Sequence, residues 1–338
     1  SIKRRHILDD LSSGNLKILV GTHALIEDYV AFSRLGLVVV DEQHRFGVHQ
    51  RNKLLSKGIQ PHLLTMTATP IPRTLALSIH GDLDVSQITE LPPGRTPIKT
   101  SVFSNNQREA VYEIVKQEII KGQQAYIVLP LIEESEKIEL RSAMEVHKEL
   151  SSDIFSNFNV GLLHGRMNSN EKKLVIDSFM NHEIQILVST TVIEVGVDVP
   201  EATVMVIDHA DRFGLAQLHQ LRGRVGRGTK SSKCLLINAS SNSSAKDRLN
   251  VLVNSNDGFE ISEIDLRLRG PGQVLGTRQS GLPDFALASL IDDVEVLNDA
   301  RSEALSILKE DPDLTSNETL RDLLEIHWKR LIGNSHLN

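Results

Sequence analysis

The sequence has very little cysteine and no long hydrophobic run. Of 338 residues only Cys234 is a cysteine, which excludes an internal disulfide and a metal cluster held by several thiolates. No apolar run approaches the ~20 residues needed to span a bilayer, and the charged first ten residues contain no stretch of signal-peptide length. These absences predict a protein of the reducing cytoplasm that does not enter a membrane.

The chain also lacks an overall positive charge. Its net charge of -7 is not that of a general polyanion binder. Between Arg212 and Ser280, however, eleven Lys or Arg stand against five Asp or Glu. A local basic surface on an acidic body is typical of a nucleic acid held in one groove. A solvated face with chance clustering explains the charges equally well.

A third absence is the phosphate-binding loop. The pattern Gly-x-x-x-x-Gly-Lys-Ser/Thr occurs nowhere in the 338 residues. That loop supplies the backbone N–H cradle and the lysine that P-loop enzymes use to hold nucleotide phosphates. The chain by itself therefore does not encode a complete site of that kind.

What the sequence does have is a series of short aliphatic runs. Rich in Val, Ile and Leu without strict alternation, they are typical of strands buried on both faces of a parallel sheet. Helical patterns at 108–121 and 171–180 separate some of them, which predicts an α/β fold. The predicted strands are Lys17–Val20, Leu37–Val40, His62–Met66, Ala125–Leu129, Val160–Leu163, Ile184–Val188, Val204–Ile207 and Cys234–Ile237.

Two breaks divide the chain into three segments. Three prolines and a glycine within 91–97 cannot continue a helix or a central strand, so we expect a linker there. A Ser/Asn-rich loop at 238–244 ends the strand pattern, and helical patterns follow it. The predicted segments are 1–95, 96–238 and 239–338.

An acidic pair follows the second predicted strand directly. Asp41 and Glu42 stand where the strand Leu37–Val40 ends, and ligands of open α/β sheets bind beyond the carboxyl ends of strands. Asp41 is suited to hold Mg²⁺, and Glu42 to orient and deprotonate an attacking water. By itself the pair is more typical of a polar turn.

Neighbouring strand tips carry compatible groups. Thr67 and Thr69 follow the next strand and are suited to hydrogen-bond His44 or a carboxylate. Thr22 and His23 follow the preceding strand, where a hydroxyl and backbone N–H groups suit a phosphate oxygen. Three successive tips of this kind predict a phosphate-binding edge.

The block Gln220–Gly228 is the strongest pattern in the chain. Arg224 and Arg227, three apart, are expected on one helical face, and the glycines between them allow close approach. Guanidinium groups match phosphate geometry, and an arginine supplied across a domain gap neutralises charge on a transferred phosphoryl group. An exposed basic turn is the alternative.

A further block follows the sixth predicted strand. Thr190 and Thr191 stand at its start, where hydroxyls are suited to contact a nucleic-acid phosphate. Asp198 precedes Pro200 and is suited to contact a nucleotide or to pair with an arginine of the next block. A turn cap explains Asp198 equally well.

Taken in order, these blocks resemble the motifs of superfamily 2 helicases over about residues 16–237. Thr22 and His23 resemble motif Ib, the run 41–44 motif II in its DEQH form, and Thr67 with Thr69 motif III. The run 189–200 resembles motif V, and Gln220 to Arg227 motif VI. The resemblance implies that Gln220, Gly196 and Asp198 contact the nucleotide.

Downstream, the chain resembles the translocation (TRG) element shared by the RecG and Mfd families. The runs 257–261, 265–272 and 275–281 carry this resemblance, which maps Arg248, Arg269 and Gln279 onto the polar network of the element. His44 and the Arg-Gly-Pro-Gly bend at 269–272 favour the RecG family of branched-DNA helicases. An inert surface loop is the alternative.

The resemblance implies two RecA-like lobes, the first incomplete over 1–95 and the second over 96–238, followed by a helical translocation module over 239–338. It implies ATP and Mg²⁺ as cofactors, branched double-stranded DNA as partner, a monomer, and His44, Thr67 and Thr69 as coupling residues. The phosphate loop is then expected upstream of Ser1, so the chain is expected to be inactive alone and to expose apolar sheet surface. An Mfd-type translocase and a non-catalytic DNA- or protein-binding module remain alternatives.

Overall fold

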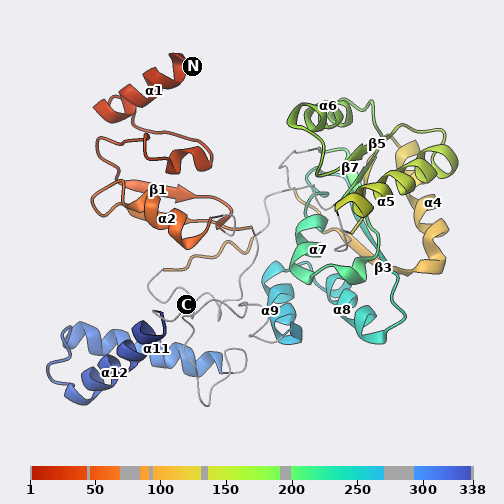
Figure 1. Cartoon of the computed structure of the whole chain (residues 1–338). Helices are drawn as coiled ribbons and strands as arrows, with labels where there is room; N and C mark the ends of the chain where they lie inside the picture. The colour runs from red at the N-terminus through yellow and green to blue at the C-terminus, as the bar shows by residue number, and fades with distance from the viewer. Residues whose placement is uncertain are drawn as a thin grey trace. The chain divides into compact units, whose positions relative to one another are not determined.

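The computed structural model describes residues 2–43, 46–68, 84–90, 94–130, 136–190, 199–269 and 293–335. It divides the chain into two compact units, Ser1–Pro70 and Ile71–Asn338. Figure 1 labels the helices and strands of both units.

The first unit is a short α/β unit around two parallel strands. Leu37 of β1 pairs with His62 of β2, and the register continues to Val40 and Thr65. Val38 and Val40 are buried against Leu54 of α2. Its elements are α1 (Ile2–Ser13), the 3-10 helix η1 (His23–Ile26), β1 (Leu37–Val40), α2 (Val48–Leu55) and β2 (His62–Thr65).

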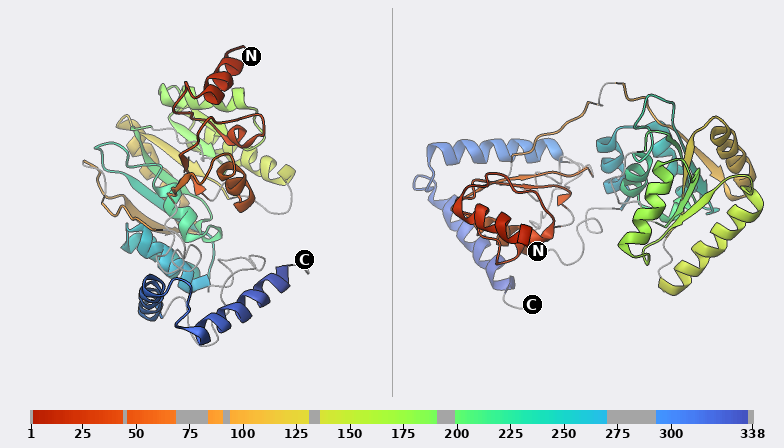
Figure 2. Two further views of the ribbon diagram at one scale, coloured as in Figure 1. Left: turned by 90° about the vertical axis from the view of Figure 1, so that its left-hand side faces the viewer. Right: turned by 90° about the horizontal axis from the view of Figure 1, so that it is seen from above.

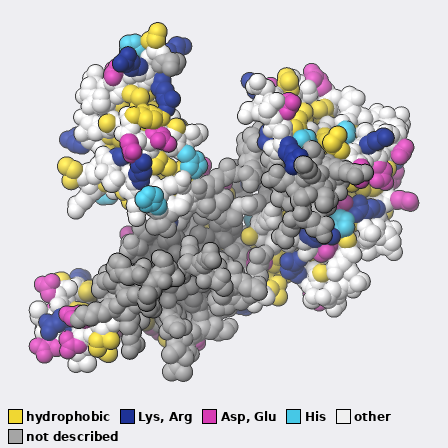
Figure 3. All heavy atoms as spheres, in the orientation of Figure 1, with side chains coloured by type: hydrophobic (Ala, Val, Ile, Leu, Met, Phe, Trp, Pro, Cys, Tyr) yellow, Lys and Arg dark blue, Asp and Glu magenta, His cyan; other side chains and the backbone are white. Residues whose placement is uncertain are grey.

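The other side of this small sheet is apolar and exposed. Leu37 and Val39 of β1 are 57% and 51% exposed, and Leu64 of β2 is 50% exposed. Figure 3 shows hydrophobic side chains gathered on the visible face of this unit. The sequence of β1 predicts a strand that is buried on both faces, but in this structure only one of its faces is buried.

One predicted strand is absent. The structure has no strand over 17–20, where Ile18 and Val20 are 78% and 89% exposed. A strand needs a neighbouring strand for its backbone groups and a packed face for its side chains. This segment has neither among the described residues, so the prediction over Lys17–Val20 is wrong for this structure.

The second unit is built on a six-stranded parallel sheet with the strand order β3-β8-β7-β4-β6-β5. All strand pairs are parallel, which confirms the predicted α/β class. The sheet elements and their helices are β3 (Lys99–Ser104), η3 (Asn105–Gln107), α4 (Arg108–Ile120), β4 (Gln124–Val128), α5 (Glu136–Glu149), the π-helix η4 (Leu150–Ile154), β5 (Val160–Leu163), α6 (Ser169–Met180), β6 (Ile186–Ser189), β7 (Ala202–Ile207), η5 (Ala210–Arg212), α7 (Leu215–Arg222) and β8 (Lys233–Asn238).

Helices cover both faces of this sheet. Val111 and Val115 of α4 pack with Leu150 and Phe155 against one face. On the other face α6, α7 and the first two helices after β8 form a second core, which contains Phe179. Figures 1 and 2 show α4 and α5 on the side of the sheet opposite α7 and α8. This doubly covered sheet explains why its central strands are continuous aliphatic runs.

Strand β3 was not predicted. Its sequence, Lys-Thr-Ser-Val-Phe-Ser, is mostly polar, and the strand lies at the edge of the sheet with β8 as its one neighbour. An edge strand need not be buried on both faces, so it carries no aliphatic run.

Helices alone follow β8 in the described residues. They are α8 (Ser243–Asn254), α9 (Gly258–Arg269), α11 (Val294–Glu310) and α12 (Glu318–Ser335). Leu249 and Leu252 of α8 and Ile261 of α9 are buried in the core shared with α7. Helices α8 and α9 thus pack onto the second unit beside α7, which leads into the arginine-containing block Gln220–Gly228.

Candidate functional site

The acidic pair lies at the tip of β1. Asp41 is exposed and Glu42 is half-buried. The Gln43 N–H donates to Met66 O at 2.9 Å, and the Met66 N–H donates to Val40 O at 2.8 Å, so the tips of β1 and β2 are tied together. The two carboxylates are therefore held on a fixed edge of the sheet.

Glu42 adopts a backbone conformation that is rare for a residue with a side chain. Its φ is +51°, in the left-handed region, at a cost of about 1–3 kcal/mol. The Glu42 N–H donates to Asp41 Oδ1 at 2.9 Å. A strained backbone conformation persists only where the surrounding structure holds it in place, and such conformations cluster at functional sites. Asp41 is exposed and accepts this bond, whereas Glu42 is half-buried, so the two carboxylates lie in different environments.

The loop before β1 contacts the segment after the acidic pair. The His23 ring stacks on the Phe46 ring, with centroids 4.3 Å apart and planes 5° apart. Thr22 begins η1 with its carbonyl accepting from the Leu25 N–H. The predicted blocks at 21–26 and 41–47 are thus neighbours in space. Thr67 is exposed just beyond β2, whereas His44 and Thr69 lie outside the described residues.

The residues of the first unit fit one carboxylate ligand to Mg²⁺ rather than a protein cage. Among the residues that the structure describes, no group of three or more His, Cys, Asp or Glu is placed to hold a metal. Mg²⁺ commonly takes one or two carboxylates and completes its shell with water and phosphate oxygens. The exposed Asp41 fits that role.

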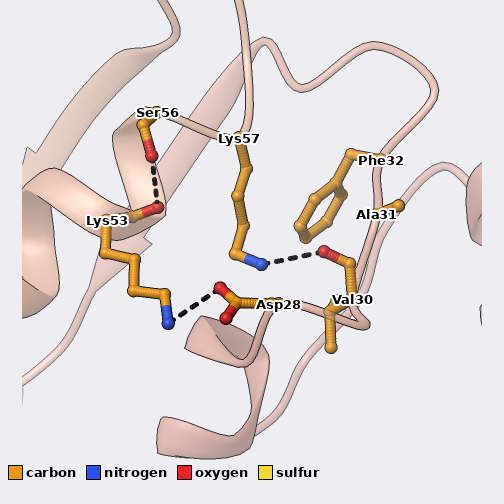
Figure 4. Close-up of a pocket in the computed structure, with 7 residues that line it drawn as sticks. All are labelled: Asp28, Val30, Ala31, Phe32, Lys53, Ser56 and Lys57. Atoms are coloured by element: carbon orange, nitrogen blue, oxygen red, sulfur yellow. Dashed lines mark hydrogen bonds and ion pairs between the residues drawn. The ribbon is translucent and has the colours of Figure 1, made fainter.

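The first unit also has a small pocket that is separate from the predicted site residues. Figure 4 shows the Lys53 amine reaching Asp28, at 2.8 Å, and the Lys57 amine reaching the Val30 carbonyl, at 2.9 Å. Burial lowers the pKa of Lys57. None of the predicted site residues lines this pocket, and its polar groups satisfy each other.

In the second unit, Thr190 follows β6 and is 1% exposed. Its N–H donates to Leu163 O at 3.2 Å, and Ser189 donates its hydroxyl to the Thr190 carbonyl at 2.5 Å. The structure thus places Thr190 inside the edge of the sheet rather than on its surface. Thr191, Gly196 and Asp198 lie outside the described residues.

The arginine block does not form the continuous helix that its spacing predicted. Helix α7 ends at Arg222, and Gly223 caps it. Gly226 has a φ of +75°, which no helix accommodates. Arg224 is half-buried and Arg227 exposed, and both lie in the turn beyond the helix. Gln220 is half-buried in the last turn of α7. The expectation that both arginines share a helical face is therefore wrong, because the glycines end the helix before them.

Arg222, the first arginine of the block, is buried and was not predicted as a site residue. It is 2% exposed. Its Nη1 donates to Leu252 O at 2.8 Å and to Ser255 O at 2.9 Å, at the end of α8. Its guanidinium therefore joins α7 to the helices that follow. Arg222 lies on the same helical turn as the buried Leu218 and Leu221, a signal visible in the sequence.

His219 completes this contact and gives it a pH dependence. Arg222 Nη2 donates to His219 Nδ1 at 2.9 Å. Burial, with a smaller contribution from the Arg222 charge, lowers the pKa of His219 to about 4. The neutral ring that accepts this bond is therefore the favoured form in the folded protein.

We expect the folded chain to lose stability in acid through His219. The unfolded chain binds the proton near the ordinary histidine pKa, so the stabilisation is complete above about pH 6.5 and is lost as the pH falls to about 4, with a size of roughly 2–3 kcal/mol. Urea unfolding at pH 7 and pH 4.5 measures it. His219→Asn keeps an acceptor for Arg222 without titrating, and should lose less stability over this range. An identical pH dependence in both proteins would refute the assignment.

A buried ion pair at the end of β7 was also missed. Arg108 of α4 and Asp208 form two hydrogen bonds, of 2.8 and 2.5 Å, and Asp208 is 5% exposed. Arg108 also donates to Tyr112 Oη at 3.4 Å. The pair fixes the start of α4 against the sheet. No pattern in the sequence indicates that these two residues, 100 positions apart, would meet.

Of the three predicted coupling residues downstream, Arg248 has described contacts. It lies in α8, and its Nη2 donates to the Asp211 carbonyl of η5. The Asp211 carboxylate accepts from the Ala239 N–H at 2.9 Å. Arg248 thus ties α8 to the sheet. Arg269 ends α9 with a side chain outside the described set, and Gln279 lies outside the described residues.

Comparisons with known proteins agree with this arrangement. The model of DEAD/DEAH box helicases matches residues 2–77, and that of the helicase conserved C-terminal domain matches 106–229. A yeast Dbp5 structure, from S. cerevisiae, has a TM-score of 0.51 at 16% identity, covers 76% of this chain and 70% of its own, and supports the fold alone. Two parallel-sheet units with these matches identify the RecA-like α/β fold of superfamily 2 helicases.

More specific matches separate the remaining alternatives. The family model "ATP-dependent DNA helicase RecG, domain 3, C-terminal" matches residues 255–334. The RecG of Synechocystis sp. is 59% identical over 99% of this chain and 40% of its own length, and that of Bacillus subtilis is 50% identical over 91% and 45%. A structure of RecG bound to a three-way DNA junction has a TM-score of 0.68 at 46% identity, over 87% of this chain and 38% of that one.

The chain belongs to the RecG family of ATP-dependent DNA helicases. It spans less than half the length of the Synechocystis and Bacillus subtilis relatives. No helix in the described part of the chain is long and apolar enough to cross a membrane.

Proposed function

We propose that this chain forms part of an ATP-driven double-stranded DNA translocase that remodels branched DNA, including stalled forks and Holliday junctions, in recombination and repair. The observation that carries the proposal is the likeness to RecG bound to a three-way DNA junction, at 46% identity over 87% of the chain. Residues 1–95 and 96–238 then form two motor lobes, and 239–338 the translocation module. The protein acts as a cytoplasmic monomer.

In this proposal ATP is hydrolysed between the lobes. Asp41 holds Mg²⁺, which supplies charge neutralisation for the phosphates, and Glu42 orients the attacking water and accepts its proton. The fixed tip of β1 and the distinct environments of the two carboxylates support this division of roles.

Arginines from the second lobe complete the site. Arg224 and Arg227 reach the γ-phosphate, where a guanidinium stabilises the charge of the transferred group. Gln220, Gly196 and Asp198 contact the nucleotide. The turn beyond α7 supports this role, because it leaves Arg227 exposed and Arg224 half-buried.

The other predicted residues couple ATP hydrolysis to movement or contact the DNA. His44, Thr67 and Thr69 sense the state of the acidic pair, and Arg248, Arg269 and Gln279 link the lobe to the translocation module. Thr22, His23, Thr190 and Thr191 serve the DNA backbone. Thr190 is the weakest of these, since it is 1% exposed and reaches DNA only if the edge of the sheet opens.

The test uses two proteins. One is the chain alone, and the other is a chimera in which this chain replaces the matching 335 residues of the Synechocystis relative. We expect no ATP turnover above background from the chain alone, because its sequence lacks the Gly-x-x-x-x-Gly-Lys-Ser/Thr loop. We expect the chimera to hydrolyse ATP faster when a three-way junction is added. A folded chimera without junction-stimulated turnover would overturn the proposal, as would steady turnover by the chain alone.

A further inference from the structure

The turn that carries Arg224 and Arg227 is held by the linker segment before β3. Arg95 Nε donates to Gly226 O at 3.0 Å. Thr96 Oγ1 makes a longer bond, 3.4 Å, to Lys230 O. These contacts join segments more than 130 residues apart, so the linker is packed onto this turn.

The turn is also closely packed at its two glycines. At Gly226, where φ is +75°, an added Cβ would lie 2.9 Å from Ile98 Cγ1. At Gly228 an added Cβ would lie 3.2 Å from the carbonyl oxygen of Pro200. The turn is therefore enclosed between the linker and the segment before β7, and side chains at these glycines would displace it.

The bond from Arg95 acts on the direction of Arg227. The Gly226 carbonyl and the Arg227 N–H belong to one planar peptide group. Fixing that carbonyl fixes the plane, and with it the direction in which the Arg227 backbone leaves the turn. Arg227 itself is exposed.

We propose that Arg95 is a positioning residue for the arginine turn, through its hydrogen bond to the peptide between Gly226 and Arg227. The linker then sets where Arg227 points, so movement of the linker is transmitted to the arginine that meets the nucleotide. The catalytic part of this inference rests on the proposed function, whereas the positioning itself does not.

The first experiment measures positioning in the chain itself. Hydrogen exchange at the amides of 224–228 is compared in the wild type, Arg95→Met, Arg95→Lys and Thr96→Val. We expect faster exchange in Arg95→Met, a value near wild type in Arg95→Lys, whose amine still donates to the carbonyl, and little change in Thr96→Val. Exchange across the sheet reports whether each variant is folded. Unchanged exchange in a folded Arg95→Met chain would refute the positioning role.

The second experiment measures the consequence in the chimera. We expect Arg95→Met to lower kcat for ATP hydrolysis by about 10–100-fold, the size typical of a small displacement of a catalytic group. The KM for ATP should stay within about twofold, and Arg95→Lys should restore most of the rate. Equal loss in Arg95→Lys and Arg95→Met, or a change in KM alone, contradicts positioning through the hydrogen bond. If the wild-type chimera has no activity, the proposed function fails, and the exchange experiment alone decides the positioning role.

Discussion

Replacing Arg227 by alanine in the chimera is expected to lower the maximal rate of ATP hydrolysis by about a thousandfold or more, the range found for arginines that stabilise phosphoryl transfer. The structure places Arg227 in a turn beyond α7, next to a peptide plane held by Arg95. An alanine there removes the guanidinium and leaves the buried contacts of the turn intact. Steady-state turnover with a saturating three-way junction measures the effect.

Arg212→Ala is the matched control for this variant. Arg212 is also an exposed arginine of the second unit, at the end of η5. We expect its loss to change the rate by less than about threefold, because exposed surface charges contribute little. Similar rates in Arg227→Ala and wild type would remove Arg227 from the reaction. Equal losses in both variants would indicate a general effect of positive charge.

The second large effect is expected at Glu42. In the chimera, Glu42→Gln should lower kcat by about 10²–10⁴-fold, the contribution typical of a general base. Glutamine preserves the size of the side chain and the strained backbone, but it does not accept the proton of the attacking water. Nucleotide affinity, measured with a fluorescent ATP analogue, should stay close to wild type.

Glu27→Gln is the control for charge in the first unit. Glu27 is exposed in the loop after η1 and, like Glu42, carries one carboxylate. A wild-type rate is expected there. If Glu42→Gln hydrolyses ATP at the wild-type rate, Glu42 is not the base. If it loses nucleotide affinity instead of rate, its role is in binding.

Much of the sheet was predictable because parallel strands covered on both faces leave aliphatic runs. The runs at 125–129, 160–163 and 204–207 correspond to β4, β5 and β7. The amphipathic pattern at 108–121 corresponds to α4, which buries Val111 and Val115. These elements could be predicted because their buried positions are occupied by apolar residues, which are visible in the sequence.

What the sequence did not predict depends on partners far along the chain. The run 17–20 has the composition of a strand but no neighbour to pair with among the described residues. Strand β3 is the opposite case: it pairs with β8, but its sequence lacks the aliphatic composition of a buried strand. In the same way, Arg222 and Arg95 are ordinary arginines until the fold brings backbone carbonyls to them.

For the site, the sequence predicted a chemistry but not a geometry. The blocks at 41–44 and 220–227 indicated carboxylates and guanidinium groups at strand and helix ends. The spacing of Arg224 and Arg227 suggested a helix, but Gly223 and the positive φ of Gly226 end it. A pattern of residue types does not record where a backbone turns.

The central claim is that the acidic pair of one unit and the arginine turn of the other close on the same nucleotide. Distances between spin labels on Asn52 and Asn170, exposed residues of α2 and α6, test it in the chimera with all cysteines removed except those introduced for labelling. A phosphoryl-transfer analogue such as ADP with beryllium fluoride should shorten and narrow the distance distribution relative to the nucleotide-free protein. The same distribution with and without the analogue would contradict the claim.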